Sequence, residues 1–348
     1  MKGIFITDLE GPLSKNDNAF ELAKNYIPDG DKFFSLVSKY DDVLADVFHR
    51  PNYKAGDTLR LILPFLKAYG VTSKEMEEYS SESILLVPKA KETIKTVRSW
   101  MPSFIVSTSY EQYVKAVCDW LEFPFENAFC TRVNIDKYEM DEIEKEKVKK
   151  WSREIVKMPM IQIPRNAKSL KDFSKRDQKT IERLDEIFFE EIPKMKCGKM
   201  LEEVNPIGGY EKAEAVKMIT ENMNANFSNV IYFGDSITDV ESFKLVKDNG
   251  GVSISFNGNQ YAIREAEIAV LSKDTFPILT LSHAFKRKGK EGVFEYVEKW
   301  DEMFGESDLC PKVLPQIKVI NDENKEKLAE ESSVFRKTVR GEAIGKLG

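Results

Sequence analysis

Four short groups of residues carry side chains that could, if brought together, transfer a phosphoryl group. They are Asp8-Leu9-Glu10-Gly11, Ser107-Thr108-Ser109, Lys212 and Gly234-Asp235-Ser236-Ile237-Thr238-Asp239. An aspartate that attacks phosphorus forms an acyl phosphate, which divides a difficult hydrolysis into two easier steps. Asp8 is the candidate nucleophile. Glu10, two residues further on, could protonate the leaving oxygen and then deprotonate the attacking water.

The other groups could supply what such an attack needs. Hydroxyls and free N–H groups at a helix start, as expected at Ser107 and Thr108, form a cradle for phosphate. Lys212 is expected at a helix start, where the helix dipole disfavours a cation. It could therefore be placed there to pair with the negative charge of phosphate and Asp8. Asp235 and Asp239 offer carboxylate oxygens that suit Mg²⁺. Taken singly, each group also fits a plainer interpretation, as a helix cap, an exposed lysine or turn-forming aspartates.

A parallel sheet could bring these groups to one edge. Apolar runs typical of β-strands cover residues 3–7, 103–106, 229–233 and 252–256, and three of them end at a group named above. Apolar residues at helical spacing predict helices over 89–100, 111–121 and 212–223. Alternating strands and helices predict a doubly wound α/β fold, in which ligands bind at the carboxyl ends of the strands.

Two segments interrupt this alternation and predict additions to the core. Residues 15–86 read as a helical cap and residues 134–205 as a second, mainly helical insertion. The predicted catalytic core is therefore 1–14, 87–133 and 206–305. Residues 306–348 form a C-terminal extension, in which the chain from Cys310 onward is expected to be peripheral, first a Pro-punctuated strand or coil and then a polar helix over 322–339.

Composition and charge exclude several classes of protein. The formal net charge is −6 and the 52 basic residues are dispersed, which argues against nucleic acid as a partner. No apolar stretch approaches the roughly 20 residues of a membrane helix, so direct membrane insertion is not expected. The four cysteines form no CxxC pair and the chain has two histidines, which argues against a zinc site. We expect a cytoplasmic protein.

The four groups together resemble the motifs of haloacid dehalogenase superfamily phosphatases. The match lies at Asp8-Leu9-Glu10-Gly11, Ser107, Lys212 and Gly234-Asp235-Ser236-Ile237-Thr238-Asp239. The spacing from Lys212 to Asp235 resembles the phosphoserine phosphatase branch. The likeness covers roughly residues 1–14, 87–133 and 206–280 and neither insertion.

The resemblance implies a role for each matched residue. Asp8 would be the nucleophile with its other oxygen on Mg²⁺, and Glu10 the acid and base, its backbone carbonyl also binding the metal. Ser107 and Lys212 would hold the phosphate of a small phosphorylated substrate. Asp235 would bind Mg²⁺ directly, while Asp239 would support the metal and Lys212. Most of these phosphatases carry aspartate where this chain has Glu10, so rate and substrate range are in question, although enolase-phosphatases also have glutamate there.

Other functions stay open at this point. The whole chain also resembles archaeal proteins labelled as subunit R of the energy-converting hydrogenase A of methanogens, which implies a protein complex as partner. A scaffold or regulatory subunit that retains the fold without turnover is therefore an alternative. Phosphoryl transfer to another acceptor is a further one. Dehalogenation is disfavoured, because that chemistry needs no metal and would leave Asp235 and Asp239 without a purpose.

Overall fold

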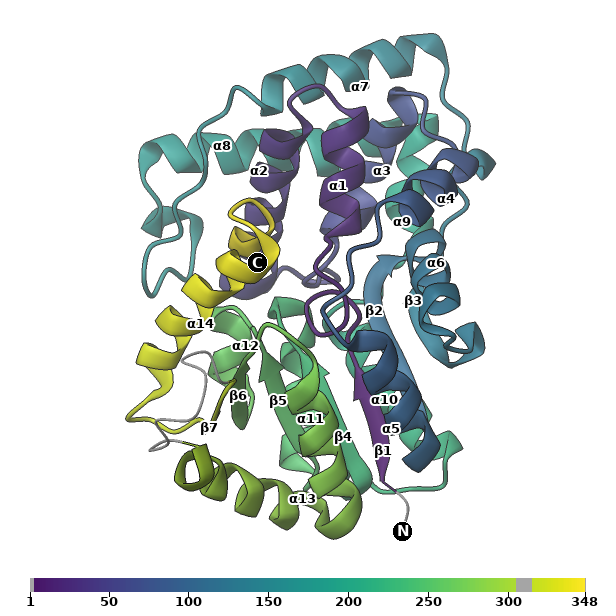
Figure 1. The fold of residues 1–348 in the computed structure, drawn as a ribbon. Helices are drawn as coiled ribbons and strands as arrows, with labels where there is room; N and C mark the ends of the chain where they lie inside the picture. The colour runs from purple at the N-terminus through teal and green to yellow at the C-terminus, as the bar shows by residue number, and fades with distance from the viewer. Residues whose placement is uncertain (1–2, 305–314, 348) are drawn as a thin grey trace.

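A single seven-stranded sheet forms the base of the molecule. The computed structural model describes residues 3–304 and 315–347. The strand order is β3-β2-β1-β4-β5-β6-β7, parallel except for β7, and Figure 1 shows a helical unit above the carboxyl ends of the strands. The strands are β1 (Ile4–Thr7), β2 (Ser103–Tyr110), β3 (Ala128–Thr131), β4 (Val230–Gly234), β5 (Val252–Phe256), β6 (Ile268–Leu271) and β7 (Gln316–Val319).

The centre of the sheet is where the strand order reverses. β1 pairs with β2 on one side and β4 on the other, with Ile6 opposite Phe104 and Tyr232. The next strands along the chain then run outward on each side, so the crevice beside β1 is the place where doubly wound sheets bind ligands. The predicted fold class is confirmed. The four expected strands correspond to β1, β2, β4 and β5, while β3 and β6 were not predicted and β7 lies in the segment that was expected to be strand or coil.

Helices cover both faces of this sheet because its strand residues alternate between two cores. Phe5 packs in one apolar cluster with residues of α5, α6 and α13, whereas Ile4 and Ile6 pack in another with α10 and α11. Such burial on both faces explains the continuous apolar runs of the strands. The helices of the core are α5 (Ala90–Trp100), α6 (Glu111–Leu121), α10 (Tyr210–Asn222), α11 (Val240–Asp248), α12 (Gln260–Glu265) and α13 (Phe276–Phe304).

The two insertions share one hydrophobic core. The ring of Phe188, from the second insertion, lies 5.9 Å from Phe65 and 6.0 Å from Tyr40, both from the first. The sequence predicts them as separate additions, but their apolar faces pack on each other as one helical unit. Its helices are α1 (Asn18–Tyr26), α2 (Gly30–Asp42), α3 (Thr58–Ala68), α4 (Ser73–Glu82), α7 (Glu142–Ile155), α8 (Lys175–Asp185) and α9 (Lys199–Glu203).

The last helix, α14 (Lys325–Arg340), connects the two halves of the molecule. It runs from the edge of the sheet toward the helical unit, where the C-terminus lies (Figure 1). Its buried face is a stripe with residues four apart, Leu328, Ser332, Arg336 and Arg340. The predicted helix is present, but the expectation of a peripheral extension is wrong for α14. Residues 310–314 of that expectation lie outside the described residues.

None of the helices that the structure describes is long and apolar enough to cross a lipid bilayer.

Candidate active site

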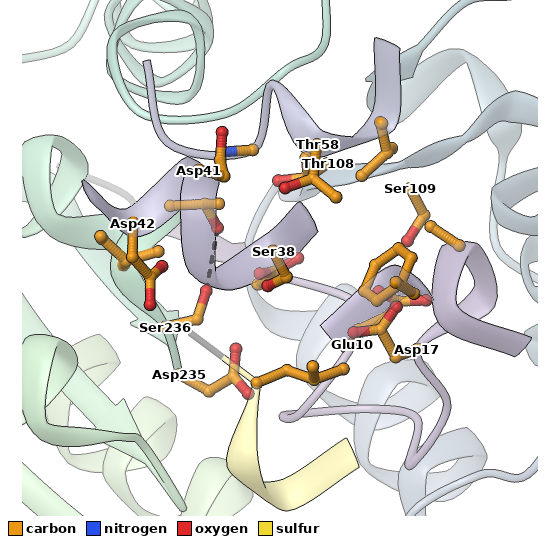
Figure 2. A pocket seen from close by; sticks show the side chains of 18 of the residues that line it. Glu10, Asp17, Ser38, Asp41, Asp42, Thr58, Thr108, Ser109, Asp235 and Ser236 are labelled. Atoms are coloured by element: carbon orange, nitrogen blue, oxygen red, sulfur yellow. Dashed lines mark hydrogen bonds between the residues drawn. The ribbon is translucent and has the colours of Figure 1, made fainter. Parts of the chain in front are cut away.

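The predicted groups meet between the sheet and the helical unit. A cavity of about 80 Å³ opens there, and Asp8, Glu10, Thr108 and Asp235 are among the residues that line it. Figure 2 shows Glu10, Thr108 and Asp235 around this cavity, together with Asp41 and Asp42 of α2. The carboxyl ends of β1, β2 and β4 form its floor, so the sheet does bring distant residues together.

Lys212 is fully buried and bridges two of the predicted acids. Its Nζ donates to Asp8 Oδ2 at 2.5 Å and to Asp239 Oδ1 at 2.8 Å. It stands in the first turn of α10, after Gly209, whose φ of +51° suits glycine. Burial opposes the charge on the lysine, but Asp239 and Asp8 outweigh it and raise the pKa of Lys212 above its ordinary value. Lys212 is therefore a charged group held against the candidate nucleophile.

Asp8 stays in an electrostatically costly position despite this lysine. Burial raises the pKa of Asp8 to about 7, with a further increase from Asp239 and Asp235, while Lys212 opposes the shift. Its Oδ1 accepts a hydrogen bond from the backbone N–H of Leu9 at 2.6 Å. A positively charged ligand would therefore stabilise the ionised form of Asp8.

Asp239 links the end of β4 to Lys212 through hydrogen bonds. Its Oδ1 accepts from Lys212 and from the Tyr232 hydroxyl at 2.7 Å, and its Oδ2 accepts from the backbone N–H groups of Asp235 and Ser236 at 2.9 and 3.1 Å. Both oxygens are thus occupied by donors. This favours the supporting role for Asp239 over direct metal ligation.

Asp235 meets two arginines that the sequence did not suggest. Arg336 and Arg340 of α14 both pair with its Oδ2, Arg340 through Nη1 at 3.0 Å. Its Oδ1 has no hydrogen bond to any described residue. Arg340 also donates through Nε to the carbonyl oxygen of Lys15 at 3.0 Å and through Nη2 to that of Asn16. The arginines stand four residues apart on a polar helix, but the sequence does not say what that face packs against.

The carboxylates fit a hard divalent cation. Asp8, Asp235 and Asp239 each have a carboxylate oxygen within one group whose members lie within 4.8 Å of one another, and all three residues are buried. Such a set of oxygens suits Mg²⁺, which keeps several waters and takes one or two carboxylates from the protein. The free Oδ1 of Asp235 and the carboxylate of Asp8 are the oxygens suited to hold it.

The hydroxyls of Ser107, Thr108 and Ser109, which the sequence predicts at a helix start, lie in the last residues of β2, and they differ in their partners. Ser107 is fully buried and its Oγ accepts a hydrogen bond from the backbone N–H of Ser109 at 3.2 Å. Thr108 lines the cavity, and its buried hydroxyl has no partner among the described residues. Ser109 lines the cavity as well, so the hydroxyls available there are those of Thr108 and Ser109, while the Ser107 hydroxyl orders the end of β2.

Glu10 lies in the same cavity and is tied to the helical unit. Its Oε1 accepts from the backbone N–H of Asn18 at 2.8 Å, at the start of α1. Burial, together with Asp17, raises the pKa of Glu10 well above its ordinary value, while Arg340 opposes the shift. The residue is near the nucleophile, and its role as acid and base stays a prediction.

A comparison with known protein families identifies the family of the chain. The family model of haloacid dehalogenase-like hydrolases matches residues 89–280, more than half of the chain. The protein belongs to this family. The matched region contains Ser107, Lys212, Asp235 and Asp239, and it begins after Asp8.

Solved structures similar to this hydrolase include one that extends over the whole chain. A gene product from Archaeoglobus fulgidus, AF1437, is 28% identical, with 100% of this chain and 99% of that one covered and a TM-score of 0.84. The apo form of a phosphoserine phosphatase is 15% identical, with 80% and 98% covered and a TM-score of 0.49. The resemblance to the superfamily is confirmed, whereas the hydrogenase subunit label stays a prediction.

The helical unit adds wall residues to this hydrolase that no sequence motif predicted. Thr58, at the start of α3, lines the cavity with a buried hydroxyl that has no partner among the described residues. Asp41 accepts from the Tyr53 hydroxyl at 2.6 Å and from the backbone N–H of Gly56 at 2.9 Å. Burial, with Asp57, raises the pKa of Asp41 to about 8. These contacts hold the loop before α3 over the site.

Gly11 provides a test of the close packing around Asp235. Its φ is +98°, and a Cβ there would overlap the Asp235 carboxylate. In this hydrolase we expect Gly11→Ala to lower activity on the order of 10²-fold, since a ligand misplaced by about 1 Å has that effect. Gly70→Ala is the control, because Gly70 has a φ of +87° and open space around it. Both variants should lose some thermal stability from the backbone, and equal activity in the two would contradict the packing argument.

Proposed function

We propose that the protein is a Mg²⁺-dependent phosphomonoester hydrolase that acts through an aspartyl phosphate on Asp8. The observation that carries the proposal is Lys212, fully buried between Asp8 and Asp239 at the carboxyl ends of β1 and β4, with Asp235 beside them. Charged groups buried together at the mouth of a cavity are typical of functional sites, and a cation held beside a carboxylate nucleophile suits a phosphate ligand, which supports the proposal. Family membership supports the hydrolase class.

The residues of this chain would divide the reaction between them. An oxygen of Asp8 attacks phosphorus while the ester P–O bond breaks, and Glu10 gives a proton to the departing alcohol oxygen. Water then attacks the phosphorus of the aspartyl phosphate, Glu10 takes its proton, and inorganic phosphate leaves with Asp8 restored.

The remaining groups would hold the phosphate and the cation. Lys212 and the Thr108 hydroxyl, at the end of β2 that Ser107 orders, would face the phosphate oxygens. Asp8, Asp235 and the backbone carbonyl of Glu10 would hold Mg²⁺, with Asp239 behind them. When bound, Mg²⁺ supplies the positive charge that lets a carboxylate approach a phosphate dianion.

The substrate would be small. A cavity of about 80 Å³ accommodates a phosphoryl group and a few further atoms, as judged from the ~10–15 Å³ that one water needs in the same measure. The helical unit and α14 enclose it, which would keep bulk water from the acyl phosphate. This favours a compact phosphorylated metabolite.

Release of phosphate under controlled metal supply tests the proposal. Purified protein with p-nitrophenyl phosphate and a panel of small phosphate esters should release phosphate with Mg²⁺, lose at least ~100-fold in excess EDTA, and recover when Mg²⁺ is restored. Release that is indifferent to EDTA would refute the metal dependence. No release from any ester would favour the scaffold or regulatory subunit, whose protein partner would then be sought by co-purification.

A further inference from the structure

The feature that the proposed reaction does not use is the pair of arginines on Asp235. Arg336 and Arg340 come from α14, outside the matched family region, yet both guanidinium groups pair with Oδ2 of this candidate metal ligand. The side chains of the three residues are 3%, 4% and 3% exposed, so water screens these pairs little. Arg336 Nη1 also donates to the backbone oxygen of Asp235 at 3.2 Å.

The arginines balance the charge of the three carboxylates of the candidate metal site before any ligand arrives. Three carboxylates, Asp8, Asp235 and Asp239, are in ion pairs with three cations, Lys212, Arg336 and Arg340. The same residues without the arginines would carry a net negative charge and attract a cation strongly.

We propose that Arg336 and Arg340 make cation binding depend on phosphate. A divalent cation on Oδ1 of Asp235 adds two positive charges beside two guanidinium groups in a buried site. A phosphate dianion restores the balance, so cation and phosphate bind together better than either binds alone. Arg336 and Arg340 are thus positioning residues that hold Asp235 by Oδ2 and tune its affinity. The inference rests on the proposed metal and phosphate site.

Linkage makes the effect reciprocal and measurable without turnover. If phosphate raises the affinity for Mg²⁺ by some factor, Mg²⁺ raises the affinity for phosphate by the same factor. Isothermal titration of wild-type protein with Mg²⁺, with and without saturating inorganic phosphate, should show at least ~10-fold tighter binding with phosphate. The converse titration should return the same ratio, and it requires no variant.

Variants of Arg336 separate its charge from its packing. Arg336→Met removes one guanidinium and should tighten Mg²⁺ binding in the absence of phosphate by about 10-fold, with a smaller gain on adding phosphate. Arg336→Lys keeps the charge and should remain within about threefold of wild type. Lys327→Met is the control, because Lys327 lies on the same helix with its side chain 79% exposed. Thermal unfolding checks that each variant is folded.

The outcomes distinguish this inference from the proposed function. Equal Mg²⁺ affinity with and without phosphate in the wild type overturns the inference, as does an Arg336→Met variant that binds Mg²⁺ no tighter. The same change in Arg336→Lys and Arg336→Met also overturns it, since charge would then not be the cause. Coupled binding in a protein that hydrolyses no phosphate ester would leave the inference standing and refute the hydrolase.

Discussion

Asp8→Asn is expected to lower the rate of phosphate release on the order of 10⁴-fold or more. The amide is a poor nucleophile and forms no acyl phosphate, so the two-step route is closed. The fold should persist, because the asparagine oxygen still accepts a hydrogen bond and Lys212 keeps Asp239 as its partner. Initial rates with p-nitrophenyl phosphate and Mg²⁺, together with thermal unfolding, measure both effects.

A covalent trap makes this prediction specific. Rapidly quenched wild-type protein should carry phosphate on the peptide that contains Asp8, in a form that hydroxylamine releases, and Asp8→Asn should carry none. Asp177→Asn is the matched control, because Asp177 is a buried aspartate at the start of α8 in the helical unit. A residual rate in Asp8→Asn within tenfold of the control would show that another group attacks phosphorus.

Lys212→Met is expected to remove activity and to destabilise the protein. The substitution leaves Asp8 and Asp239 buried without their shared cation, and breaking a buried ion pair by removing one partner costs about 3–5 kcal/mol. Phosphate release should fall on the order of 10³-fold, since a charge-assisted contact to the transferring group is lost. Urea unfolding measures the loss of free energy, and steady-state rates measure the loss of activity.

A second substitution tests whether unpaired charge is the cause. Asp239→Asn in the Lys212→Met background removes one of the two stranded carboxylates while keeping an oxygen for the backbone N–H groups of Asp235 and Ser236. The double variant should be more stable than Lys212→Met alone, which is a coupling that additive effects do not give. If it is less stable by the sum of the single losses, Lys212 acts through packing and not through charge.

The sequence predicted which cavity residues stand at the carboxyl ends of the strands, because the signal lies in the neighbouring residues of the chain. Asp8 and Asp235 directly follow apolar runs, and in a parallel sheet such ends meet at one edge. Lys212 was found because a cation at a helix start is unusual enough to need an explanation. Strands β3 and β6 were missed because periodicity alone does not separate so short an apolar segment from a stretch of buried helix.

The cavity residues that come from the helical unit and from α14 could not be predicted in this way. Thr58 and Asp41 reach the cavity through the packing of α2 and α3, and no spacing in the sequence reports that packing. Arg336 and Arg340 illustrate the limit most clearly. Their four-residue interval shows that they share a helix face, but the partner of that face, Asp235, is about a hundred positions earlier. Charge complementarity between distant segments leaves no periodic signal.

The shared core of the two insertions has a mechanical consequence. The chain enters and leaves the helical unit twice, and Leu347 at the far end of the chain packs into the same cluster. A helical unit joined to the sheet by several chain connections cannot rotate about a single hinge, because all the connections would have to bend together. Ligands should therefore enter and leave through a slight rocking of the whole helical unit against the sheet.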